Sequence, residues 1–305
     1  MLERPGSLPE FEAQFPDDAA CARWLFEKRW PEGFRCPGCG HDKGWELSRG
    51  MLLVECARCH HQTSVTAGTA LHRSHLPLKL WFLAAWLVAT HKNGMSARQL
   101  WLQLGLGSYK TAWLLLRKLR RAMVDPEREP LAGLVEVDET SLSFRTRDDP
   151  IAARPGRSHE GKLPIAGAVE IVGKGPGRVR LAVIEDYSAG SLGGFVKGAI
   201  ADASTVVSDG WSGYATLTDV KHDPKVIGPM AAHVLLPWIH RVFANAKRWG
   251  LGVYHGLRRK HLQAYLDEFV FRFNRRRTPA AAFERLLGLA VTLGPASYQM
   301  LTSRS

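Results

Sequence analysis

Two aspartates in strand-like segments are the first residues of this sequence that could do chemistry. Asp138 lies in LVEVDET (134–140), and Asp209 follows the apolar residues that open VVSDG (206–210). If these segments are parallel neighbours in one sheet, both carboxylates lie near the same edge. Two carboxylates that close repel each other unless a cation binds between them. Hard oxygen ligands favour Mg²⁺ or Mn²⁺, and two such ions can activate water and stabilise a phosphate leaving group.

The carboxylates around Asp138 leave other assignments open. Glu136 and Glu139 lie on the same segment, and strand alternation places Glu136 on the face of Asp138 and Glu139 on the opposite face. Composition does not decide which carboxylate binds metal. From the residues alone, a structural or surface role for the aspartate pair is an equal alternative.

Four cysteines form two CxxC pairs separated by 16 residues, namely Cys36 with Cys39 and Cys56 with Cys59. Tetrahedral zinc needs four ligands at about 2.3 Å, and each pair supplies two thiolates from one tight turn. The segment between the pairs is typical of a hairpin with Gly50 at its tip, so a zinc ribbon is expected. Four thiolates leave no open position on the metal, and zinc is therefore expected to be structural. The alternative is two unrelated pairs of buried cysteines.

A helical segment follows over residues 95–123. It is typical of two helices joined at a glycine-containing turn, with Ser96 and Ser108 as their N-caps. This arrangement suits a helix-turn-helix. The side chains available to contact DNA are Arg98, Tyr109, Lys110 and Lys118. An ordinary helical hairpin with a solvated basic face is the alternative.

The charge of the chain indicates a polyanionic partner. A net charge of +12 and a pI near 9.7 favour nucleic acid. The excess is concentrated in residues 98–121 and in residues 241–277, where ten lysines or arginines stand against two acids. The apolar run at 78–90 is too short to span a bilayer, and the N-terminus lacks the apolar core of a signal peptide. We therefore expect a cytoplasmic, nucleoid-associated protein without a membrane partner.

The pattern of elements predicts an α/β domain over 131–290, because strand-like runs are followed there by flanking helices. A basic loop is expected at 144–162. The predicted divisions are an N-terminal helical segment (1–30), the zinc ribbon (31–68), the helical DNA-binding region (69–124), the α/β domain (131–290) and a C-terminal tail (291–305).

Five motifs occur in a fixed order, and together they resemble a known family. They are CPGC…CARC, VEVDET, SDGWSGY, WIHRVFANAKRW and YLDEFVFRFNRR. This set resembles bacterial insertion-sequence transposases with an N-terminal zinc ribbon and an RNase H-like catalytic domain of the DDE type, over residues 12–290. The resemblance implies binding to terminal inverted repeats, strand cleavage, strand transfer into target DNA and two catalytic Mg²⁺ or Mn²⁺ ions. It also implies a homodimer or higher oligomer on double-stranded DNA.

The resemblance assigns site residues as well. Asp138 and Asp209 match the first two metal ligands, and the third position falls on Asn245, followed by Lys247, as in an Asp-Asp-Asn-Lys variant. Lys247 would hold a phosphate or the departing strand. The later helix would supply supporting residues on one face, at Glu268, Arg272 and Arg275.

Asn245 is the main departure from a three-carboxylate site. A neutral amide adds no negative charge and cannot serve as a base, and its alternative role is that of a helix-surface amide. Two rival functions therefore stay open. One is a zinc-ribbon and helix-turn-helix regulator with an inactive nuclease-like domain. The other is an RNase H-like nuclease without strand transfer.

Overall fold

The chain folds into two compact units. The computed structural model describes residues 5–48, 52–144, 161–225, 232–254 and 257–302. The first unit contains the residues up to Asp125 together with the segment that begins at Arg275, and the second runs from Pro126 to Asn274. The second unit is shorter than the predicted domain of 131–290, because α10 (Pro279–Thr292) belongs to the first unit.

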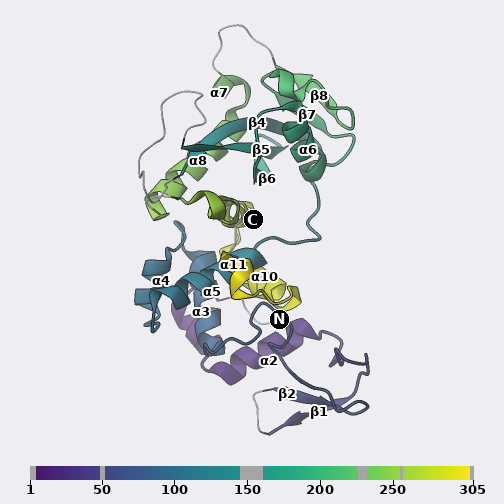
Figure 1. The fold of residues 1–305 in the computed structure, drawn as a ribbon, viewed down its shortest axis with the longest axis vertical. Coiled ribbons are helices and arrows are strands. Elements are labelled where there is room, and N and C mark those ends of the chain that lie inside the picture. Colours follow the sequence, from purple (N-terminus) through teal and green to yellow (C-terminus); the bar gives the residue numbers. More distant parts are fainter. Residues whose placement is uncertain (1–4, 49–51, 145–160, 226–231, 255–256, 303–305) are drawn as a thin grey trace. The chain divides into compact units, whose positions relative to one another are not determined.

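The core of the first unit is a cluster of aromatic rings contributed by both ends of the chain. Phe11 lies on α1 (Leu8–Gln14), Trp24 on α2 (Asp18–Arg29) and Phe82 on α3 (Leu78–Thr90). Phe15 and Phe283 join them, with ring centroids 4.9 to 6.5 Å apart. Since Phe283 lies on α10, the C-terminal segment completes the core that the N-terminal helices begin (Figure 1).

The predicted ribbon is a three-stranded antiparallel sheet in the order β1 (Gly44–Leu47), β2 (Leu53–Cys56) and β3 (Gln62–Ser64). The hairpin between the cysteine pairs is confirmed by β1 and β2. Its expected tip, Gly50, lies outside the described residues. Arg29 fixes the ribbon to α2, since its Nη1 donates to the carbonyls of Ser64 and Val65 at 2.9 Å each.

The predicted helical hairpin consists of α4 (Ala97–Gln103) and α5 (Tyr109–Ala122). Both predicted caps are confirmed: Ser96 Oγ accepts from the Gln99 N–H at 3.2 Å, and Ser108 Oγ accepts from the Thr111 N–H at 3.1 Å. The apolar run at 78–90 forms α3, with most of its residues buried. Among the described helices, none combines the length and apolarity that a membrane span needs. After α10, the unit ends with α11 (Tyr298–Thr302).

The second unit is built on a five-stranded mixed sheet. Its strands are β4 (Leu134–Ser143), β5 (Lys162–Val172), β6 (Gly175–Val183), β7 (Thr205–Ser208) and β8 (Lys221–Pro224). Their order is β6-β5-β4-β7-β8, antiparallel from β4 to β6 and parallel from β4 to β8. This is the strand order of RNase H, so the predicted RNase H-like α/β fold is confirmed.

Helices cover the two faces of this sheet. On one face, α6 (Ala189–Ala199) packs over Val135, Val137 and Val206. On the other, α8 (Pro237–Tyr254) and α9 (Leu262–Asn274) pack over Val207 and its neighbours (Figure 1). Short elements connect them: η1 (Ser212–Tyr214), α7 (Ala232–Leu235) and η2 (Arg259–His261). Most of the expected basic loop, residues 145–160, lies outside the described residues.

A glycine sets how closely α8 approaches the sheet. Gly167 on β5 is paired with Asp138 on β4. A Cβ atom at Gly167 would lie 2.5 Å from Cε1 of Phe243 on α8, so no larger residue fits without displacing the helix. The absence of a side chain at this point brings α8 against the strand that carries Asp138.

Candidate active site and zinc site

The four cysteines of the ribbon converge as the sequence predicts. The Sγ atoms of Cys36, Cys39, Cys56 and Cys59 all lie within 4.8 Å of one another, with cross-pair distances of 3.6 Å for Cys36–Cys59 and Cys39–Cys56. Four sulfurs at about 2.3 Å from a tetrahedral zinc are themselves about 3.8 Å apart. The donor set and its spacing therefore fit a structural zinc ion.

The two cysteine turns share one backbone pattern. The N–H of Gly40 donates to the carbonyl of Cys36 at 2.9 Å, and the N–H of His60 donates to that of Cys56 at 3.1 Å. Both closing residues have a positive φ, +72° at Gly40 and +55° at His60. Glycine adopts this conformation easily, whereas histidine does so at some strain. The His60 Nδ1 atom lies 3.4 Å from Glu55 Oε1. Since four cysteines complete the zinc site, His60 is not needed as a ligand.

The sheet of the second unit brings the two aspartates together. In the parallel pairing of β4 with β7, Val135 is opposite Val206 and Glu136 is opposite Val207. Continuing this register by two residues places Asp138 opposite Asp209, and neighbouring strands are about 4.8 Å apart. Because Val207 packs under α8, strand alternation directs both aspartates toward the α8 face.

Asp138 lies in a strongly perturbed environment. Its side chain is 7% exposed. Burial raises the pKa of this carboxyl to about 8, and the nearby charges of Glu139 and Asp209 act in the same direction. A desolvated carboxyl beside other carboxylates is one whose charge a bound cation would stabilise. The donor set at this edge of the sheet therefore fits a divalent metal ion.

The other two carboxylates of β4 have structural partners. Glu136 Oε2 accepts from the N–H groups of Trp238 and Ile239 at 2.9 Å each, and so holds the first turn of α8. Burial raises the pKa of Glu136. Glu139 points to the opposite face, where the Tyr214 hydroxyl donates to its Oε2 at 2.7 Å. The alternation expected from the sequence is thus confirmed, and each glutamate has a hydrogen-bond partner of its own.

Helix α8 presents two side chains to the Asp138 strand. His240 Nε2 lies 3.4 Å from Asp138 Oδ2. About two helical turns further on, Lys247 Nζ donates to Thr140 Oγ1 at 2.7 Å. Burial lowers the pKa of Lys247, against the opposing influence of Asp138. His240 is not among the site residues predicted from the sequence. Its spacing of seven residues from Lys247, which puts both on one helix face, could have indicated it.

Asn245 has a different orientation. It is exposed, and at about 100° per residue it lies about 140° around α8 from His240. The residues that α8 buries, such as Val242 and Ala246, lie on the side that packs against the sheet. The structure therefore brings Asp138, Asp209, His240 and Lys247 into one site and does not bring Asn245 there.

Comparison with known proteins relates both the ribbon and the second unit to transposases. Residues 130–274 match the model of the ISXO2-like transposase domain, and residues 16–62 match that of the transposase zinc-ribbon domain. The chain therefore contains a transposase zinc-ribbon domain followed by an ISXO2-like transposase domain. It is also 26% identical, over 281 residues, to a Halobacterium salinarum protein described as an uncharacterized protein in transposable element ISH50. That alignment covers 85% of this chain and 91% of the relative. The matched catalytic domain ends at Asn274, where the second compact unit also ends.

Two of the predicted supporting residues of this transposase-family chain meet in a buried cluster. Glu268 on α9 is fully buried, and the Tyr254 hydroxyl lies 3.1 and 3.0 Å from its two carboxylate oxygens. Arg272 Nη1 lies 3.9 Å from Glu268 Oε1. Arg275 follows the end of α9 and belongs to the first unit. The cluster joins the end of α8 to α9, and its role in the reaction stays a prediction.

The four residues predicted to contact DNA differ in their availability. Arg98 and Tyr109 are exposed. Lys110 is also exposed, with its Nζ 4.6 Å from the Tyr298 ring centroid. Lys118 is half-buried, with its Nζ 5.6 Å from the centroid of the Trp81 ring, and burial lowers its pKa. Arg98 and Tyr109 are therefore the better placed of the four.

Other basic residues of α5 hold the C-terminal segment. Arg121 Nη1 donates to the Gly294 carbonyl at 2.7 Å, and Arg117 Nε donates to that of Leu301 at 3.3 Å. Arg120 is 2% exposed. Part of the basic excess seen in the sequence thus stabilises the first unit.

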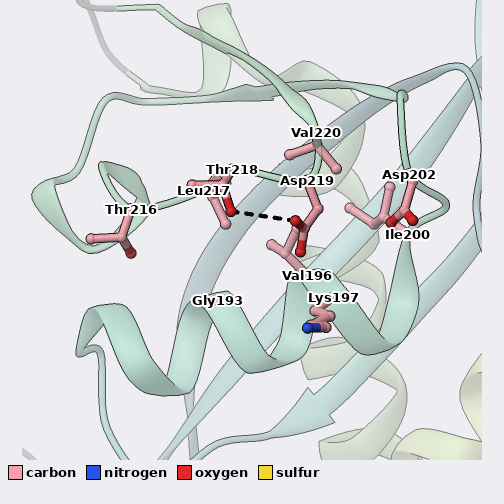
Figure 2. A pocket seen from close by; sticks show the side chains of 10 residues that line it. All are labelled: Gly193, Val196, Lys197, Ile200, Asp202, Thr216, Leu217, Thr218, Asp219 and Val220. Atoms are coloured by element: carbon pink, nitrogen blue, oxygen red, sulfur yellow. Dashed lines mark hydrogen bonds between the residues drawn. The ribbon is translucent and has the colours of Figure 1, made fainter.

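A hollow of about 190 Å³ lies on the α6 side of the second unit. Figure 2 shows Gly193, Val196 and Lys197 on the helix and Thr216–Val220 on the segment above it. Thr218 Oγ1 is 3.3 Å from Asp219 Oδ1 across its rim. Since α6 covers the sheet face opposite to α8, this hollow is separate from the Asp138 site.

Proposed function

We propose that this chain is a DNA transposase that binds the terminal inverted repeats of an insertion sequence, cuts the element ends and joins them to target DNA. One observation carries the proposal: Asp138 on β4 and Asp209, directly after the parallel neighbour β7, lie close enough for their charges to interact, and His240 and Lys247 of α8 contact the same strand. The family relationship supports the same reaction. The protein would act in the nucleoid, as a homodimer or higher oligomer that holds two element ends.

The catalytic metal ligands proposed are Asp138, Asp209 and a third residue on α8. Two bound Mg²⁺ or Mn²⁺ ions would activate the attacking hydroxyl and neutralise the phosphate at which it reacts. His240, beside Asp138, is the better candidate for the third ligand. Asn245, assigned by the sequence motif, is the alternative. An imidazole ligand would make the site more favourable for Mn²⁺ than for Mg²⁺, since Mg²⁺ prefers oxygen.

The chain's own residues have distinct tasks in this reaction. Asp209 is held in orientation because its Oδ1 accepts from the Trp211 N–H at 2.9 Å. Lys247, held by Thr140, would bind a phosphate oxygen next to the scissile bond. Glu136 fixes the first turn of α8 and so the position of His240. Rigid elements position each group, which is what a metal-dependent phosphoryl transfer requires.

DNA recognition is assigned to the first unit. The zinc ribbon and the α4–α5 hairpin would contact the inverted repeats, with the exposed Arg98 and Tyr109 as the contacting side chains of the hairpin. Lysine and arginine contacts to phosphates would give binding that weakens as salt rises. Replacing Arg98 by alanine should lower the slope of this salt dependence if the residue contacts a phosphate.

The test is end cleavage and strand transfer in vitro, with a labelled terminal repeat and a supercoiled target plasmid. The full-length, zinc-loaded protein is compared with Asp209→Ala, His240→Ala and Asn245→Ala, each in Mg²⁺ and in Mn²⁺. The proposal requires that Asp209→Ala abolish both steps. Loss with His240→Ala and retention with Asn245→Ala would identify His240 as the third ligand, and the reverse result would identify Asn245.

Two results would overturn the proposal in different directions. Sequence-specific binding without any cleavage by the wild type, in either metal, would favour a regulator with an inactive domain. Cleavage of the repeat without joined product, when pre-cut ends are supplied, would favour a nuclease without strand transfer.

A further inference from the structure

A large aromatic side chain is partly exposed next to the proposed metal ligand Asp209. Trp211 is 40% exposed, and it follows Asp209 by two residues. Gly210 between them has a φ of +80°, so the chain turns sharply at this point. Exposed tryptophan surface is unfavourable in water, and a single exposed side chain by itself needs no functional explanation. What distinguishes Trp211 is how rigidly its ring is held.

Trp211 is held at its backbone and at its ring. Its backbone N–H donates to Asp209 Oδ1 at 2.9 Å, and its indole Nε1 donates to the Tyr187 carbonyl at 3.3 Å. The ring also lies over Gly213, where an added Cβ would be 2.9 Å from both Cδ1 and Nε1 of the indole. A glycine is therefore needed under the ring. The remaining exposed surface is held in place before any ligand arrives.

The ring is connected to the Asp138 site through a short chain of contacts. Tyr187, which accepts the indole N–H through its carbonyl, donates its hydroxyl to the Thr140 carbonyl at 3.1 Å. Thr140 in turn accepts from Lys247 through its hydroxyl. The exposed indole and the lysine proposed to bind phosphate are thus anchored to the same strand residue.

We propose that the exposed surface of Trp211 is a stacking site for a nucleobase of the DNA strand whose phosphate lies at Asp138 and Asp209. The inference rests on the proposed function, because that function supplies the DNA strand. An indole stacks on any base through its π-face. A base in intact duplex is already stacked on its neighbours. The ligand is therefore a nucleotide that has left the duplex stack, at or beside the position that is cut.

The test is a double-substitution cycle on binding, which does not depend on catalysis. Terminal-repeat duplexes with a short unpaired stretch at the cleavage point carry one abasic nucleotide at successive positions within that stretch, so that removing a base breaks no base pair. Their dissociation constants are measured without divalent metal. The zinc-loaded wild type is compared with Trp211→Ala and Trp211→Phe. Tyr298→Ala is the matched control, since Tyr298 is an aromatic residue that is 54% exposed on α11, outside both proposed sites.

We expect one abasic position to weaken wild-type binding by roughly 5- to 150-fold, the range of one base–aromatic stack. Trp211→Ala should bind the DNA that has no abasic nucleotide more weakly than the wild type does, by the same factor. The abasic nucleotide at that position should not weaken the binding of Trp211→Ala any further. Trp211→Phe should recover part of the affinity, and Tyr298→Ala should keep the full abasic penalty. Similar melting curves for all variants would exclude misfolding as the cause.

Three results would overturn the inference. The first is an undiminished abasic penalty in Trp211→Ala. The second is the absence of any abasic penalty in the wild type. The third is a change in oligomeric mass with unchanged DNA affinity, which would assign the ring to a protein interface. Cleavage and joining by the wild type are scored separately, so the failure of the stacking site and the failure of the transposase assignment give different results.

Discussion

Replacing Asp138 by asparagine should stabilise the metal-free protein while it removes activity. The pKa of Asp138 is raised from its ordinary value of 3.8 to about 8, chiefly by burial. Because the folded pKa lies above the unfolded one, the folded state holds a proton that the unfolded state releases. The stability from this proton is complete below about pH 4 and is lost as the pH rises through about 8.

The size of the effect follows from the same two values. Ionising Asp138 in the fold costs about 1.4 kcal/mol for each pH unit between the two pKa values. Between pH 5 and pH 8.5, the wild type should therefore lose roughly 4 kcal/mol of unfolding free energy relative to Asp138→Asn. Comparing two pH values removes the difference in packing between the acid and the amide.

The assay is urea unfolding at pH 5 and at pH 8.5, combined with hydrogen exchange of peptides from β4 so that the second unit is followed by itself. Magnesium and manganese are left out of the buffers, and the tightly held zinc is kept. Asp223→Asn is the control, since Asp223 pairs at the surface with Lys225. Added Mn²⁺ should restore the wild type at pH 8.5 and leave Asp138→Asn unchanged. Equal pH dependence in the wild type and in Asp138→Asn would refute the reasoning.

Three further predictions concern the framework of the two sites. Gly167→Ala should cost about 1–3 kcal/mol of stability, because its Cβ would overlap Phe243; in urea unfolding and end-cleavage assays, Phe243→Leu should restore part of the loss. Glu136→Ala should cost about 1–3 kcal/mol and slow cleavage, because two α8 N–H groups lose their acceptor; unchanged cleavage would exclude a positioning role. Cys59→Ser should release zinc and expose the ribbon to protease, as judged by metal content and limited proteolysis, whereas Cys21→Ala should retain the metal.

The sequence could predict the parts of the sites that depend on local pattern. The cysteine turns are fixed by CxxC spacing, and the caps at Ser96 and Ser108 depend on residues within one helical turn. The placement of Asp138 and Asp209 near one edge of the sheet could also be predicted, because side chains alternate along a strand and the two short strands pair in parallel.

The features that the sequence alone could not predict depend on packing between residues far apart in the chain. The rotation of α8, which faces His240 to the sheet and Asn245 to solvent, depends on Phe243 filling the space at Gly167, a residue 76 positions earlier in the chain. Likewise, Arg121 donates to the Gly294 carbonyl, which lies far from it in the sequence. The sequence alone therefore could not show that Arg121 has a structural role and is not part of the predicted DNA-binding surface.

The aromatic core of the first unit has a consequence for how the protein is made. Phe283 arrives from the ribosome after the whole RNase H-like unit has been synthesised, whereas its partners Phe11, Phe15 and Trp24 emerge first. A chain that stops early, at a nonsense codon or a stalled ribosome, therefore lacks one wall of that core. Truncated chains that lack Phe283 would fold poorly, and they would not compete with the intact protein for the element ends.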